Sequence, residues 1–259
     1  MSLERLAPHG AQRQSVRMTQ LAPASDATAA DWIVAELQTF GESVLSLVPA
    51  SFSAYVRVFH PAWRLGDGGE LTIPVRWADI GAANGTRTNP GMQLRALIGA
   101  LTYEHNLEPQ PGLYDAGPQV GSLPVDQEGT LGAVLARHTA TPERCWFAVW
   151  DGYGATRADV LSAPTFHLLA RDYHLLVGPV GAAAESALDP PWYQSPNLWW
   201  PDDRAWCVAT EIDLDTTYIG CTDACRDEIL AAPELETFPI DPATRIDWYG
   251  DPVNPLPEE

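Results

Sequence analysis

The chain has 259 residues, with 15 basic and 34 acidic side chains and a formal net charge of −19. All 15 of those basic residues are arginine, and the absence of lysine excludes Schiff-base chemistry, Walker A nucleotide binding and kinases that need a strand lysine. The acidity argues against nucleic acid as a partner, because phosphate binding needs clustered cations.

No apolar run is long enough to span a membrane, and the first 31 residues contain no export signal. The four cysteines are therefore expected to be reduced thiols, and the chain to be cytoplasmic. A hydrophobic fraction of 46% is enough for a sizeable core. The ten tryptophans are an unusually large share for this length.

Three regions are expected along the chain. Residues 1–28 are polar and predict a flexible N-terminal tail, and residues 251–259 predict a proline-rich, acidic C-terminal tail. Residues 29–250 are expected to form a single globular domain. Its oligomeric state does not follow from the sequence.

Within that domain, short elements of both kinds are expected. Helices are predicted at 28–41, 44–48, 78–83, 92–101, 131–138, 182–187 and 222–231, the last with Thr222 as N-cap. Strands are predicted at 54–60, 71–77, 145–150, 166–170, 173–177 and 206–219, and a long loop at 189–204. The irregular alternation favours an α+β fold, with a mostly antiparallel sheet and flanking helices.

The predicted strand 206–219 carries a row of carboxylates. Alternation places Glu211, Asp213 and Asp215 on one face, spaced about 7 Å apart. Such a row can bind a divalent metal through oxygen ligands, or it can be the solvated outer face of an antiparallel sheet.

Two histidines lie on the predicted hairpin 166–177. If Arg171 and Asp172 form its turn, His167 and His174 are diagonal neighbours on one face and could share a metal with a carboxylate. Two partly exposed histidines without a ligand are the other interpretation. Cys221 and Cys225 are four residues apart, a weak metal signal, and ordinary buried thiols explain them as well.

The loop 189–204 is the most suggestive segment of the sequence. It is dense in tryptophan and contains polar side chains, a composition typical of ligand or partner surfaces. The candidate binding residues are Trp192, Tyr193, Asn197, Trp199, Trp200, Asp202, Asp203 and Arg204. The alternative is that these tryptophans fold back onto the core.

Several segments together resemble a family of uncharacterised bacterial proteins from high-GC genomes. They are Arg76 to Ile80, Pro90 to Gln93, Trp146 to Gly152, Arg171 to Tyr173 and Ser195 to Gly220. No activity is assigned to that family, so the resemblance implies no residue role. The later half also resembles SMI1/KNR4-type (SUKH) proteins, an α+β group that includes toxin-neutralising immunity proteins, in its tryptophan-led strand, helix and acidic strand.

Three functions are compatible with these patterns, and no motif decides whether the chain is an enzyme. The first is a binding protein that uses the tryptophan-rich loop and the acidic sheet face, with a basic protein as partner and no cofactor. The second is a metal-dependent hydrolase built on Glu211, Asp213 and Asp215, with His167 or His174. The third is a small-molecule binder for a nucleotide or sugar, in which Trp199 and Trp200 stack on the ligand.

Overall fold

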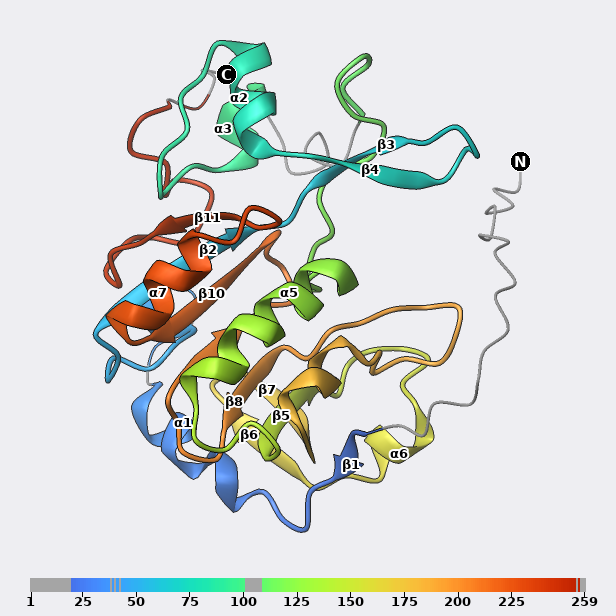
Figure 1. Ribbon diagram of the computed structural model, residues 1–259, viewed down its shortest axis with the longest axis vertical. Coiled ribbons are helices and arrows are strands. Elements are labelled where there is room, and N and C mark those ends of the chain that lie inside the picture. The colour runs from blue at the N-terminus through green and yellow to red at the C-terminus, as the bar shows by residue number, and fades with distance from the viewer. Residues whose placement is uncertain are drawn as a thin grey trace.

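The computed structural model describes residues 20–37, 39, 41, 43–100, 109–254 and 256 (Figure 1). Its strands are β1 (Ala22–Pro23), β2 (Ala54–Phe59), β3 (Ala62–Leu65), β4 (Leu71–Val75), β5 (Cys145–Trp150), β6 (Thr165–Leu168), β7 (Arg171–Gly178), β8 (Leu198–Pro201), β9 (Cys207–Ala209), β10 (Thr216–Cys221) and β11 (Glu236–Pro239).

The helices are short, and several are single 3₁₀ turns. They are η1 (Thr28–Ala30), α1 (Asp31–Glu36), η2 (Val44–Ser46), α2 (Trp77–Asn84), α3 (Leu94–Ile98), α5 (Val125–Leu135), η3 (Ala136–His138), α6 (Ala158–Leu161), η4 (Val180–Ala184) and α7 (Asp223–Leu230). None of the described helices is long and apolar enough to cross a bilayer.

Among the described residues, nine strands form one sheet in the order β1-β7-β5-β8-β9-β10-β2-β11, and β6 also pairs with β7. Every pairing in this sheet is antiparallel. Strands β3 and β4 form a separate hairpin. The predicted α+β class with a mostly antiparallel sheet is confirmed.

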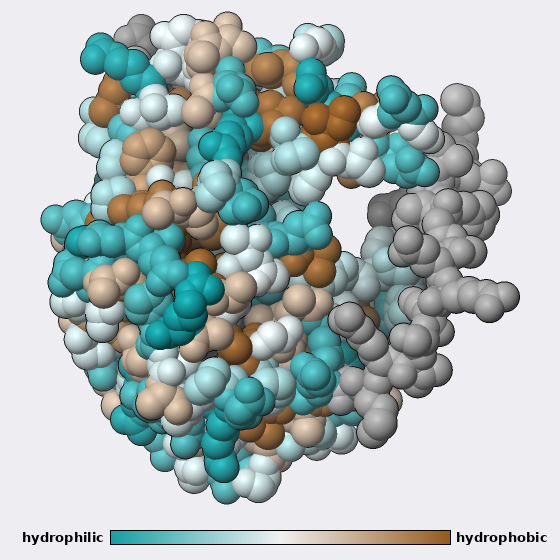
Figure 2. All heavy atoms as spheres, viewed as in Figure 1, coloured by the Kyte–Doolittle hydropathy of each residue, from teal (hydrophilic) through white to brown (hydrophobic). Residues whose placement is uncertain are grey.

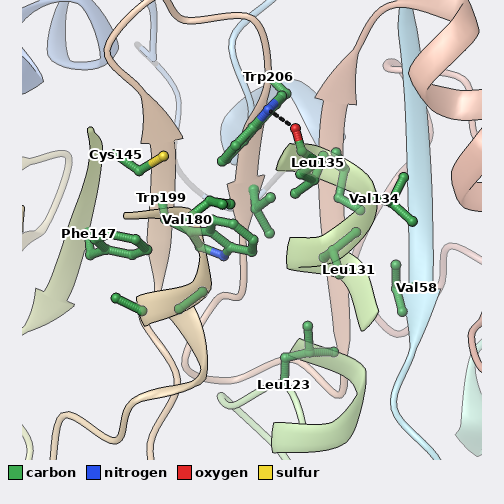
Figure 3. Close-up of a cluster of buried hydrophobic side chains, with 14 of the residues drawn as sticks. Val58, Leu123, Leu131, Val134, Leu135, Cys145, Phe147, Val180, Trp199 and Trp206 are labelled. Carbon is green, nitrogen blue, oxygen red and sulfur yellow. Dashed lines mark hydrogen bonds between the residues drawn. The ribbon is translucent and has the colours of Figure 1, made fainter. Parts of the chain in front are cut away.

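Helices α5 and α7 cover one face of the sheet, which is the near face in Figure 1. Trp199 stacks on Phe147 at a centroid distance of 6.1 Å and meets Trp206 edge-on at 5.0 Å. The indole Nε1 of Trp206 donates to the carbonyl of Leu135, at the end of α5 (Figure 3). Large side chains thus fill the space between α5 and the sheet, and we call this cluster the α5-side core.

The opposite face is covered by shorter elements. Trp32 of α1 packs edge-on against Trp200 of β8 at 6.3 Å, and η2 and the segment around Ile246 complete this α1-side cluster. Because α1 has six residues and η2 has three, their side chains do not cover the whole sheet face.

A third cluster lies beyond the end of β2, under α2, α3 and the β3–β4 hairpin. Buried Arg57 ties this part to the sheet. Its NH1 donates to the carbonyls of Pro90 and Met92 at 3.2 and 2.8 Å, and its guanidinium lies 4.6 Å from the ring centre of Phe59. Charge-assisted bonds of this kind hold a loop more firmly than neutral bonds.

Most predicted elements are confirmed, including the β2 and β5 strands and the helix at α7, where the Thr222 hydroxyl accepts from the Cys225 amide at 3.3 Å. The single strand predicted at 206–219 is wrong. The chain turns between β9 and β10, where the Leu214 amide donates to the Glu211 carbonyl. The Glu211 side chain also accepts from the Asp213 amide at 2.6 Å, so acidic residues cap a turn instead of continuing a strand.

The predicted hairpin is confirmed, but its turn is Leu169–Ala170 instead of Arg171–Asp172. His167 therefore pairs with Asp172, and His174 pairs with Thr165. The 189–204 segment is not one long loop, because it contains the buried strand β8.

The folded part extends into both predicted tails. Leu21 is buried, and β1 pairs with β7, so part of the predicted N-terminal tail belongs to the folded domain. Asn254 bonds both the backbone of Arg87 and the carboxylate of Asp251. The remaining positions of the two predicted tails, 1–19, 255 and 257–259, lie outside the described residues.

Candidate functional site

Of the three tryptophans predicted to bind a ligand or partner, Trp199 and Trp200 are core residues. Trp199 is 0% exposed and Trp200 is 1% exposed, and they point to opposite faces of the sheet because they are consecutive in β8. Neither ring is available to stack on a ligand, which corrects that expectation. Trp192 remains 52% exposed, and the buried Tyr193 hydroxyl has no hydrogen-bond partner.

The charged end of the same segment has structural partners. Asp202 accepts from the Trp146 indole at 3.0 Å, and Asp203 accepts from the Ala140 amide at 2.7 Å. Arg204 lies over the Trp32 ring at 5.3 Å. These three residues fasten neighbouring segments to the sheet, and they do not meet at a common site with Asn197.

The acidic row is divided by the β9–β10 turn. Glu211 and Asp213 both form ion pairs with Arg171, and the Asp213 pair measures 2.9 Å. Asp215 immediately precedes β10, and burial raises the pKa of its carboxyl against the opposing effect of Arg57. An arginine thus lies beside two of the carboxylates for which a metal ion was one of the two interpretations.

The two histidines have separate environments. His167 is exposed and its ring pairs with Asp172 at 2.9 Å, which raises the pKa of His167. His174 is buried, with Nδ1 3.4 Å from the Ala163 carbonyl. Within the described ranges, no three His, Cys, Asp or Glu side chains gather in a way that could hold a metal ion.

The four cysteines are buried free thiols. Cys145 and Cys207 lie in the cores on opposite faces of the sheet. A hydrogen bond with Cys221, together with burial, raises the pKa of Cys225 well above its ordinary value. Because the thiolate is the reactive and metal-binding form, these thiols fit a structural role.

Two of the predicted segments do converge, on the face covered by α1. A hollow of about 220 Å³ opens there, which we call the α1-side hollow. Its lining residues are Leu37, Gly41, Ser46, Leu47, Leu168, Leu169, Tyr173, Asn197, Leu198, Ala209, Thr210, Glu211, Asp213, Leu214, Ile246, Asp247 and Trp248. Its wall is mostly aliphatic and aromatic, and its charged lining residues are the carboxylates Glu211, Asp213 and Asp247.

Asn197 holds the turn beside this hollow in place. Its Oδ1 accepts from the Trp150 amide at 2.9 Å, and its Nδ2 donates to the Tyr153 hydroxyl and to the Thr210 carbonyl at 2.9 and 3.1 Å. Burial raises the pKa of Tyr153 to about 12, so this phenol stays protonated. Asn197 therefore positions the site, with its own hydrogen bonds already used.

Leu169 is conformationally unusual. It adopts a φ of 57°, in the left-handed region that favours glycine, at the tip of the β6–β7 hairpin. Its side chain lines the α1-side hollow. Backbone strain of this kind concentrates at ligand sites, which makes the hollow a better candidate than an accidental packing gap.

Sequence reasoning missed Arg171 as a site residue and also Tyr173, Leu214, Ile246 and Trp248. They come from distant parts of the chain and have no shared spacing. The only signal for Arg171 is that its charge is opposite to that of the acidic row. Opposite charge alone does not predict that Arg171 and Glu211, 40 residues apart in the sequence, lie side by side.

Comparisons of the chain with known protein families, with curated proteins and with solved structures give no match. The two resemblances noted in the sequence therefore stay predictions.

Proposed function

We propose that this chain is a binding protein, and that its ligand is a small molecule with an apolar body and a positively charged end. The observation that carries the proposal is the convergence of the 197–198 and 211–214 segments on one hollow. Its volume of about 220 Å³ lies just below the range of roughly 300–1,000 Å³ common for drug-sized ligands, which favours a small ligand.

The lining supports a cation over an anion. Three carboxylates and no arginine or histidine occur among the described lining residues. Each carboxylate pairs with an arginine outside the lining, Glu211 and Asp213 with Arg171 and Asp247 with Arg245. Asp213 is the most open of the three, with 75% of its side chain exposed and one oxygen engaged by Arg171. A primary amine can donate to Asp213 while the rest of the ligand contacts Leu169, Leu198 and Leu214.

The same arrangement favours binding over metal-dependent hydrolysis. Arg171 pairs with the largely buried Glu211 and with one oxygen of Asp213, which leaves too few oxygens for a divalent metal ion but leaves the second Asp213 oxygen for a single amine. The predicted ligand His167 is paired with Asp172. A nucleotide or sugar that stacks on Trp199 and Trp200 is disfavoured by the burial of both rings.

Saturation-transfer NMR with 2-phenylethylamine tests the proposal. We expect saturable transfer to the ring protons, weaker transfer with the neutral analogue 2-phenylethanol, and none with phenylacetate. Equal transfer to all three compounds, or to none, contradicts the proposed cation-binding hollow.

Two variants give the test its control. Leu214→Trp places a large ring in the hollow and is expected to abolish transfer, while Leu161→Trp adds the same ring on the exposed helix α6 and is expected to leave it unchanged. If both variants bind as the parent chain does, the ligand lies elsewhere.

A further inference from the structure

A second cavity lies far from the α1-side hollow in the fold and shares no lining residue with it. It has a volume of about 370 Å³ and is enclosed by the β3–β4 hairpin, the start of α5 and the segment before β11. Its lining residues are Phe59, Pro61, Trp63, Thr72, Pro74, Arg76, Pro124, Asp126, Gln127, Thr130, Glu234 and Glu236. Figure 2 shows the surface indented between the hairpin above and α5 below.

We call this second cavity the interlobe cavity, because it lies between the β3–β4 hairpin and α5. Its lining contains three carboxylates and one arginine. Glu236 is engaged with the backbone amides of Trp77 and Ala78 at 2.7 and 2.8 Å, and Arg76 is turned toward the carbonyl of Pro233 and toward Glu236. Asp126 and Glu234 remain as exposed carboxylates on two different walls. The cavity therefore has an excess of negative charge at its mouth.

A buried amide oxygen, Oε1 of Gln127, lies on the α5 wall of the cavity beside Asp126. Gln127 is only 9% exposed, and its Nε2 is 3.4 Å from the Phe59 carbonyl, while its Oε1 has no hydrogen-bond partner. A buried amide oxygen without a donor destabilises the fold, and a donor group in the cavity would offset that cost. The half-buried indole of Trp63 adds an aromatic surface.

We propose that the interlobe cavity binds a guanidinium group. A guanidinium is planar, carries five N–H donors and is weakly hydrated, so it can lie against Trp63 while it bonds Asp126, Glu234 and Gln127. An ammonium group is compact and strongly hydrated, and its three donors all lie on one nitrogen, so it spans separated acceptors less well than the planar guanidinium does. The ligand is an arginine side chain on a polypeptide or a free guanidino compound.

Isothermal titration with L-arginine amide, L-lysine amide and the peptide acetyl-Gly-Arg-Gly-amide tests this proposal. We expect arginine amide to bind at least fivefold more tightly than lysine amide, with affinity that falls as salt is raised. Tighter binding of the peptide identifies a polypeptide source, and equal binding identifies a free compound. No saturable binding, or equal affinity for arginine and lysine, overturns the proposal.

Three variants locate the site. Asp126→Asn with Glu234→Gln is expected to weaken arginine amide at least tenfold, and Gln127→Leu at least threefold without loss of thermal stability. The control Glu143→Gln with Asp151→Asn removes two exposed carboxylates elsewhere and has the same net charge. If the control weakens binding as much as the first pair, the effect is general electrostatics and the proposed site is wrong.

Discussion

The two faces of the large sheet are covered in different ways. On one face, the 11-residue helix α5 and the 8-residue helix α7 seal a core in which Trp199 and Trp206 have no exposed surface. On the other face, α1 and the single turn η2 leave the α1-side hollow open. The same strands β8 and β9 contribute to both faces. Both faces carry a buried core, but the shorter covering elements of the second face leave a hollow beside it.

The largest expected effect concerns the filled face. Trp199→Ala removes a ring that touches Phe147 and Trp206, and we expect it to lower the free energy of unfolding by about 4 kcal/mol. Leu214→Ala, on the wall of the hollow, should cost about 1 kcal/mol, because water already reaches the space that it leaves. Urea denaturation of both variants measures the two losses in the free energy of unfolding. Equal losses would show that the two faces are packed alike and would contradict the comparison.

The next effect is acid sensitivity. Burial lowers the pKa of His60 from 6.5 to about 4, although its bond to the Gln119 carbonyl opposes the shift. The unfolded chain therefore takes up a proton below pH 6.5 that the folded chain does not, and His60 should remove about 3 kcal/mol of stability between pH 6.5 and 4. His60→Gln should be less stable at pH 7 but show a flatter loss across that interval, and an unchanged slope contradicts the assignment.

A smaller effect with the opposite sign is expected for Glu128 on α5. It is 1% exposed, neither carboxyl oxygen has a partner, and burial raises its pKa. The contribution of Glu128 to stability is therefore most favourable below its ordinary pKa of 4.5, and it is lost as the pH rises toward the raised pKa of the folded chain. Glu128→Met should stabilise the chain by about 1–3 kcal/mol at pH 7 and by less at pH 4. Chemical denaturation at both pH values measures this, and a gain that does not depend on pH contradicts it.

The smallest effect concerns the hollow itself. Leu169→Gly should raise the free energy of unfolding by about 1 kcal/mol, because glycine accepts a φ of 57° without strain. It should also weaken binding of 2-phenylethylamine, since the leucine side chain is lost from the wall. Leu169→Ala loses most of the side chain without relief of strain, so it should weaken binding with no gain in stability. A Gly variant that is less stable than the parent shows that the turn is not strained.

Local patterns predicted much of this fold. Strands β2 and β5 are runs of β-branched and aromatic residues, and Thr222 is a suitable N-cap before an amphipathic stretch, so propensity and tertiary structure agree there. The prediction of one strand over 206–219 was wrong, because the alternation of apolar and polar residues continues through the turn at Glu211–Leu214. In that turn, side-chain bonds to the backbone override the strand pattern.

The candidate site could be predicted from the sequence less well than the helices and strands. Asn197 is predicted from the composition of the 189–204 segment, and Glu211 and Asp213 from strand alternation; all three line the hollow. The burial of Trp199 and Trp200 depends on β8 lying at the centre of the sheet, between β5 and β9. The pairing of Arg171 with the acidic turn likewise needs strands that are distant in sequence to meet. Neither fact is encoded in local spacing.

The α1-side hollow is the proposed binding site for a small molecule with a cationic end. A crystal soaked with 2-phenylethylamine tests it most directly. We predict density for the ring between Leu169 and Leu214, with the ammonium group within hydrogen-bond distance of Asp213. An empty hollow beside a ligand bound elsewhere on the chain, or an ammonium group turned away from Asp213, would contradict the claim.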